Sequence, residues 1–142
     1  MSRRLATSLL HWATGILLWL LLSVDHRIYG GLGWAFILSG GGLCLLGLVF
    51  GLMNGPGPKL TGVLRYAHPW LSRAMYLLLG WAVVALAAGS LGAPLPGPEA
   101  RTLLLALGAA SLGHGIFHLW RHTALCDGAL RRITPQVLHK HL

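Results

Sequence analysis

Four apolar segments, each long enough to cross the hydrocarbon core of a bilayer, most constrain what this chain can fold into. They cover residues 5–24, 32–53, 70–91 and 102–120, and clusters of Pro and Gly separate them. A helix needs about 20 mainly apolar residues to span a core of about 30 Å. None of the segments alternates apolar and polar residues as a barrel strand does. The sequence therefore predicts an all-α, four-helix transmembrane bundle.

The composition agrees with a membrane protein. Of the 142 residues, 55% are hydrophobic and 10% are charged, whereas soluble domains carry about 25% charged residues. We expect a single membrane domain over residues 1–142, with residues 121–142 as a tail. The first apolar segment lacks a small-x-small cleavage site, so we expect it to be retained as a span.

The basic residues predict how the chain is oriented. With four spans, both termini lie on one side of the membrane. Nine of the eleven Lys and Arg residues would lie on that side: Arg3, Arg4, Lys59, Arg65, Arg73, Arg121, Arg131, Arg132 and Lys140. The positive-inside rule makes that side the cytoplasm. This orientation and attraction to anionic lipid headgroups explain the formal charge of +8, and no nucleic-acid partner is expected.

Two of the eight histidines are expected at the same depth in the membrane. His11 lies near the start of the first segment, and His114 lies in the fourth, which runs back towards the cytoplasm. At about 1.5 Å of rise per residue, their distances from the cytoplasmic face are similar. Such a pair on different helices can ligate a haem iron between them. Small residues around His114 would give a flat macrocycle room; they are Gly108, Ala109, Ala110, Gly113 and Gly115.

A second interpretation of these two histidines needs no metal. A histidine inside a membrane can hydrogen-bond to a carbonyl or hydroxyl group across a helix interface. Ser8 and Ser111 are the candidate hydroxyl partners. The matched depth of His11 and His114 favours the haem interpretation.

The other polar groups are expected nearer the surfaces. His118 and His122 follow His114 by one and two helical turns, which predicts interfacial positions rather than iron ligation. His68 precedes a proline that suits a first helical turn, so we expect it to enter the third helix from the cytoplasmic loop, too shallow to ligate. His26 is expected in a periplasmic loop, and His139 and His141 in the tail.

The cysteines give no sign of covalent or redox chemistry. Cys44 lies in the middle of the second segment and Cys126 beyond the fourth, so we expect no disulfide between them. The sequence has no C-x-x-C-H motif, which excludes covalent attachment of a c-type haem.

Three stretches of the chain resemble the bacterial cytochrome b561 family, which is related to the b-type cytochrome subunits of formate dehydrogenases and nickel-iron hydrogenases. "LLHWATGILLWLLL" is similar to the opening helix of that family. "KLTGVLRYAHPWLSRAMYLLLGW" resembles its loop and third helix, and "GHGIFHLWRHTALCDGALRRITP" resembles its end. The order and spacing of these stretches cover nearly the whole chain.

The resemblance implies a haem-binding protein of the bacterial cytoplasmic membrane that exchanges electrons with ubiquinone or another quinone. It places haem ligands at the positions of His11 and His114. Four side chains near the cytoplasmic face would contact the quinone or the haem edge: His68, His118, His122 and Arg121. Some members of the family oxidise superoxide at the periplasmic side, and others serve larger redox complexes.

The chain departs from the family pattern at the second haem. Family members usually bind a second haem through a histidine of the second helix and another about fourteen residues before the position of His114. Here residues 32–53 contain no histidine, and Ala100 occupies the other position. We therefore expect one haem b. We also expect the protein to carry electrons or to anchor a redox complex in the membrane rather than to oxidise superoxide. The alternative is a haem-free structural subunit that stabilises an assembly.

A ridge of glycines in the second segment also has two interpretations. Gly47, Gly51 and Gly55 recur every four residues, a spacing that lets helix backbones approach closely. The ridge could pack within the bundle, or it could contact a partner redox subunit or a second copy of the chain.

Overall fold

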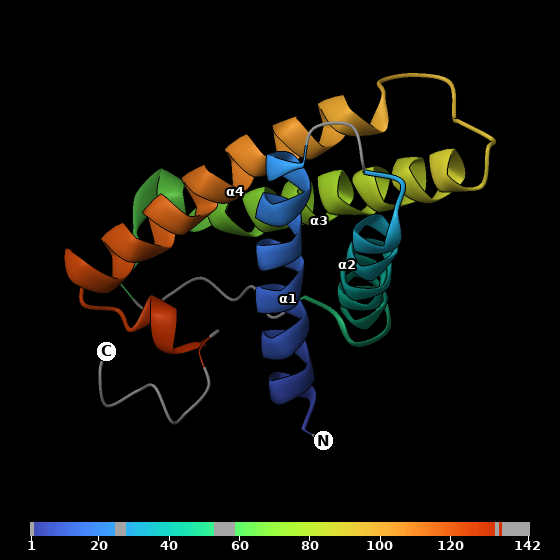
Figure 1. Ribbon diagram of the computed structural model, residues 1–142. Helices are drawn as coiled ribbons and strands as arrows, with labels where there is room; N and C mark the ends of the chain where they lie inside the picture. Colours follow the sequence, from blue (N-terminus) through green and yellow to red (C-terminus); the bar gives the residue numbers. More distant parts are fainter. Residues whose placement is uncertain (1, 25–27, 53–58, 133, 135–142) are drawn as a thin grey trace.

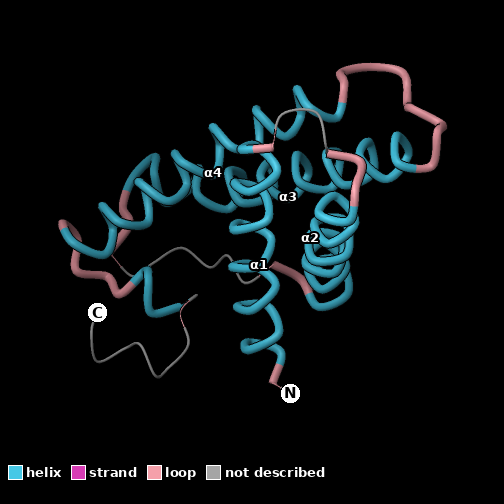
Figure 2. Tube along the Cα trace, in the orientation of Figure 1, coloured by secondary structure: helices cyan, strands magenta, loops and turns pink. Residues whose placement is uncertain are grey.

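The computed structural model describes residues 2–24, 28–52, 59–132 and 134, and within them the chain is helical without any strand (Figures 1 and 2). The four long helices and the short 3₁₀ helix that follows them are α1 (Arg3–Ser23), α2 (Gly31–Phe50), α3 (Gly62–Ser90), α4 (Ala100–Thr123) and η1 (Ala129–Arg132). Each long helix is apolar enough to cross a membrane. The prediction of an all-α protein with four candidate spans is confirmed.

The four helices form two crossed pairs. α1 packs beside α2 and α3 beside α4, and contacts of α2 with α3 and of α1 with α4 join the pairs. The α3–α4 pair runs across the direction of α1 in Figure 1. Parallel helices would appear parallel in any view, so this is not a bundle with one common axis. Leu21, Phe36, Leu86 and Leu104 are fully buried where the pairs meet.

Most of the apolar surface of the helices remains outside the core. In each helix only 22% to 28% of the most apolar stretch is buried inside the protein. Large side chains such as Leu48 and Leu77 are 83% and 75% exposed. Exposure of so much contiguous apolar surface to water would be unfavourable, whereas lipid tails solvate it. The chain is thus built as a multi-pass membrane protein.

The third helix begins earlier than predicted. The expected span started at residue 70, with His68 in a loop, but α3 starts at Gly62 and contains Pro69. Gly62 has a φ of 55°, in the left-handed region that glycine adopts without steric cost. The proline therefore does not mark a first helical turn, and His68 is part of the helix. With 29 residues, α3 is about 43 Å long, which exceeds a core of about 30 Å.

Side-chain hydrogen bonds show which chain segments meet at each end of the molecule. Arg3 donates to the carbonyl of Gly51 at 2.7 Å, and Arg4 donates to that of Arg131 at 2.7 Å. The start of α1 therefore lies with the end of α2 and with η1. Arg101 donates to the carbonyls at the other end of α1, Leu21 and Val24, both at 3.4 Å. Arg101 therefore lies at the opposite end of α1 from Arg3 and Arg4.

The glycine ridge of the second segment is shorter than predicted. α2 ends at Phe50, and Gly51 caps it with a φ of 78°, so Gly51 does not continue a helical face. Gly55 lies outside the described residues. A Cβ atom on Gly47 would lie 2.9 Å from the ring of Tyr76 in α3. Gly47 thus allows close contact between two helices of the same chain.

Candidate cofactor site

The two histidines that were expected at one depth face each other across the helix pairs. His11 of α1 and His114 of α4 have ring centres 6.1 Å apart, with their planes inclined by 51°. Two metal–nitrogen bonds of about 2.0 Å, plus about 1.1 Å from each nitrogen to its ring centre, place collinear ligands about 6 Å apart. The observed separation therefore suits an iron held between the two rings.

A second pair of rings has the same separation. His68 of α3 and His118 of α4 have ring centres 6.1 Å apart, with an interplanar angle of 75°. His118 also lies 4.4 Å from His114, too close for a metal between those two. The His118 side chain is half-buried, and its Nδ1 is enclosed and has no hydrogen-bond partner. His68 is buried inside the protein, with 5% exposure.

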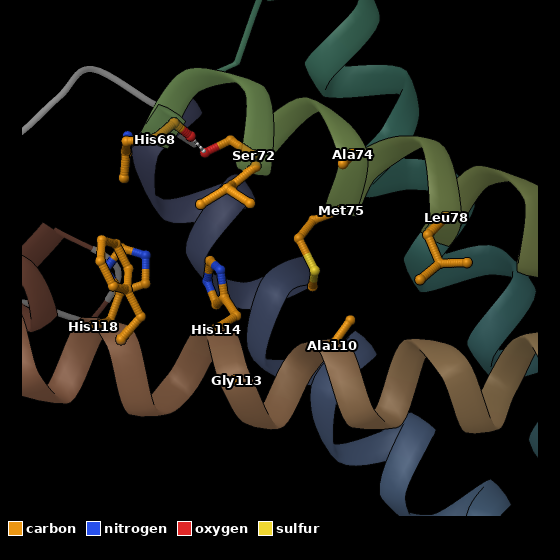
Figure 3. Close-up of a pocket in the computed structure, with 11 residues that line it drawn as sticks. His68, Ser72, Ala74, Met75, Leu78, Ala110, Gly113, His114 and His118 are labelled. Carbon is orange, nitrogen blue, oxygen red and sulfur yellow. Dashed lines mark hydrogen bonds between the residues drawn. The ribbon is translucent and has the colours of Figure 1, made fainter. Parts of the chain in front are cut away.

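A cavity lies between α3 and α4 beside these rings (Figure 3). Its volume is about 390 Å³, within the range of about 300–1000 Å³ that small-molecule and cofactor sites occupy. His68, His114 and His118 form its polar side. Leu71, Met75, Leu78 and Phe117 supply the apolar walls. The cavity can therefore hold a largely apolar molecule next to the rings of three histidines.

Arg121, a candidate contact of the quinone or haem edge, does not line the cavity but contacts His68. Its side chain is 1% exposed and forms an ion pair with Asp127, whose side chain is fully buried. Its Nε and Nη2 donate to one carboxylate oxygen of Asp127 at 2.8 and 2.5 Å. Its Nη1 lies 3.0 Å from Nε2 of His68. Arg121 therefore contacts a residue of the cavity wall, His68, rather than the cavity itself.

His122 lies apart from the cavity. His122 is half-buried, its Nδ1 lacks a hydrogen-bond partner, and it does not belong to the cavity wall. His26, His139 and His141 lie outside the described residues. Among the described residues, no three His, Cys, Asp or Glu side chains form a metal-binding group. A haem iron needs only two protein ligands, because the porphyrin supplies the other four.

The small residues around His114 have different roles. A Cβ atom on Gly113 or Gly115 would meet nothing within 4 Å, and Gly113 lines the cavity. Gly108 instead allows α4 to approach α1, since a Cβ there would lie 2.7 Å from a methyl group of Leu22. Ser111 donates to the carbonyl of Gly108 at 2.8 Å, so its proton is directed at its own helix and not at His114.

Sequence reasoning missed Asp127 as a site residue. A signal was present, because Asp127 is one of only three acidic residues in a chain with eleven Lys and Arg residues. A rare acid six residues after an arginine near the end of a span is a candidate ion-pair partner. Met75 and Phe117, which line the cavity, read in the sequence only as apolar span residues.

No protein-family model, curated protein or solved structure matches this chain in comparisons with known proteins. The resemblance to the cytochrome b561 family therefore depends on the three stretches of sequence alone.

Proposed function

We propose that this chain is a membrane b-type cytochrome that carries electrons through one haem b held by His11 and His114. The observation that supports this most strongly is the separation of 6.1 Å between the two ring centres, which fits ligands on opposite sides of one iron. A bound haem would supply reversible one-electron transfer. The absence of a histidine from α2 agrees with one haem rather than two.

The residues around the pair suit a haem in three respects. His11 and His114 provide two imidazoles from helices that pack against each other. Gly113 and Gly115 leave open space on either side of His114 in the sequence. Both side chains are partly buried, which withdraws part of each ring from water. The role of the protein is then to orient the two imidazoles.

The cavity between α3 and α4 is the proposed quinone site. It borders the ring of His114, so a quinone head inside it would lie close to the haem. Its apolar walls suit the isoprenoid part, and histidine side chains provide the polar contacts. His68 and His118 are the direct contacts in this proposal, Arg121 acts through His68, and His122 takes no part.

The same proposal covers location and partners. The protein would lie in a bacterial cytoplasmic membrane with both termini in the cytoplasm, as the distribution of basic residues favours. It would work alone or as the cytochrome subunit of a larger redox complex. Superoxide oxidation is a weaker proposal, since family members carry it out beside the haem whose ligands this chain lacks.

A reduced-minus-oxidised absorption spectrum of the purified protein tests the proposal. A haem b held by two histidines gives the sharp bands of a low-spin cytochrome, which dithionite should reveal. Protein that is folded by circular dichroism but binds no haem, even when it is expressed with added haem precursor, would instead support the structural subunit.

A further inference from the structure

Two histidine pairs in this molecule have the ring separation of a haem site, and they cannot both be used. His11 and His114 form one pair and His68 and His118 the other, each with ring centres 6.1 Å apart. His114 and His118 are neighbours on α4, only 4.4 Å apart. Two macrocycles would collide there. Something in the fold must therefore determine which pair binds the iron.

The contact between Arg121 and His68 determines the state of the second pair. A guanidinium group has five N–H donors and no acceptor. Because Nη1 of Arg121 lies 3.0 Å from Nε2 of His68, the arginine is the donor, and Nε2 is an acceptor without a proton. The proton of a neutral His68 ring is then on Nδ1. The lone pair of Nε2, which would otherwise bind a metal, is committed to the arginine.

Asp127 holds the arginine in this position. Its Oδ2 accepts from both Nε and Nη2 of Arg121, and the two side chains are at most 1% exposed. Two short charge-assisted hydrogen bonds hold the Nε and Nη2 side of the guanidinium group. Nη1 therefore cannot easily turn away from His68. The ring of Phe117 lies beside the imidazole, with ring centres 6.0 Å apart.

We propose that Asp127 and Arg121 keep His68 out of metal ligation and so leave His11 and His114 as the haem pair. Arg121 is a positioning residue that selects the ligand pair, and Asp127 is the residue that positions it. This inference depends on the proposed function only for the identity of the metal group. The hydrogen-bonding state of His68 can be measured without haem.

The first experiment measures that state directly. Haem-free protein with ¹⁵N-labelled histidine is examined by NMR in detergent micelles, and His68→Ala identifies the signals of His68. Wild type should show Nδ1 protonated and Nε2 unprotonated. Arg121→Lys keeps a donor without an acceptor and should preserve this state, whereas Arg121→Met removes the donor and should let the proton distribute between Nδ1 and Nε2. Arg65→Met, at an exposed site on the same helix as His68, is the matched control.

The second experiment asks whether the second pair becomes a haem site. His114→Ala alone should lose the low-spin spectrum. Adding Arg121→Met and Asp127→Asn to His114→Ala should restore low-spin haem binding through His68 and His118. A wild-type His68 with its proton on Nε2, or on both nitrogens, would overturn the proposal. So would a triple variant without low-spin haem when Arg121→Met has already abolished the fixed Nδ1-protonated state of His68.

The two experiments separate the inference from the proposed function. If wild type binds no haem, the cytochrome proposal fails, but the NMR measurement still tests the hydrogen bond from Arg121. If Arg121→Met does not fold, the proposal is tested by the tautomer of His68 in wild type and in Arg121→Lys, both of which should be protonated on Nδ1. A low-spin spectrum that survives His114→Ala unchanged would show that the second pair is already available, contrary to the proposal.

Discussion

Removal of the Asp127 carboxylate should destabilise the fold more than any exposed charge change. Asp127 and Arg121 are at most 1% exposed and share two hydrogen bonds, of 2.8 and 2.5 Å. Asp127→Ala would leave a buried guanidinium without its counter-charge. Breaking a buried pair from one side costs about 3–5 kcal/mol. At about 1.4 kcal/mol per factor of ten, the folding equilibrium should fall by more than about 100-fold.

Removal of both charges should cost less than removal of either one. Arg121→Met alone would leave a buried carboxylate unpaired, with a similar penalty of about 3–5 kcal/mol. In the double variant Arg121→Met with Asp127→Leu, no unpaired charge remains. The remaining cost is the lost donor to His68, about 1–3 kcal/mol for a buried polar group. The two substitutions should therefore be strongly non-additive, as expected for residues in direct contact.

The measurement is reversible unfolding in mixed micelles, followed by far-ultraviolet circular dichroism as the denaturing detergent is increased. Arg65→Ala, which removes an exposed arginine of α3, is the control and should stay within about 0.5 kcal/mol of wild type. Two results would refute the reasoning. One is an Asp127→Ala variant within about 1 kcal/mol of wild type. The other is a double variant whose loss equals the sum of the two single losses.

Three further outcomes are expected. His11→Ala and His114→Ala should each abolish the low-spin spectrum while His118→Ala keeps it, and a full, unchanged spectrum in His114→Ala would transfer the ligand role to His118. Pyridine haemochrome analysis should give about one non-covalent haem b per chain, and two would mean that the spans were misplaced or that a non-histidine ligand had been overlooked. Gly47→Ala should lower the unfolding free energy by about 1–3 kcal/mol, because its new methyl group would lie 2.9 Å from a tyrosine ring of α3. Gly15→Ala, whose methyl group meets nothing within 4 Å, should not, and equal effects at the two sites would contradict this explanation.

The parts of the fold that follow from local rules could be predicted from sequence. The lengths of the apolar segments predicted the four helices. The rise per residue predicted that His11 and His114 lie close together, because depth in a span depends only on position along it. The start of α3 could not be predicted in this way. Pro69 is compatible with a first turn but also with the interior of a helix, and local sequence does not decide between them.

The burial of Arg121 could not be predicted because it depends on chain reversal after α4. A basic residue near the end of a span normally reaches the headgroups, and this expectation treats each charge alone. Here the chain turns back within six residues and brings an acid to the arginine. A partner provided by a turn has no helical periodicity, so patterns of three or four residues do not reveal it.

The turn itself shows how the ion pair is placed. After α4, Cys126 adopts a φ of 50°, a left-handed conformation that costs a residue with a side chain about 1–2 kcal/mol. The backbone N–H of Asp127 then donates to the carbonyl of Arg121 at 3.3 Å, which returns the chain over the last turn of the helix. A strained turn persists only where its surroundings determine it. The buried ion pair between Arg121 and Asp127 holds the turn in this conformation. The same contact therefore fixes the end of α4 and the position of Nη1 of Arg121, which faces His68.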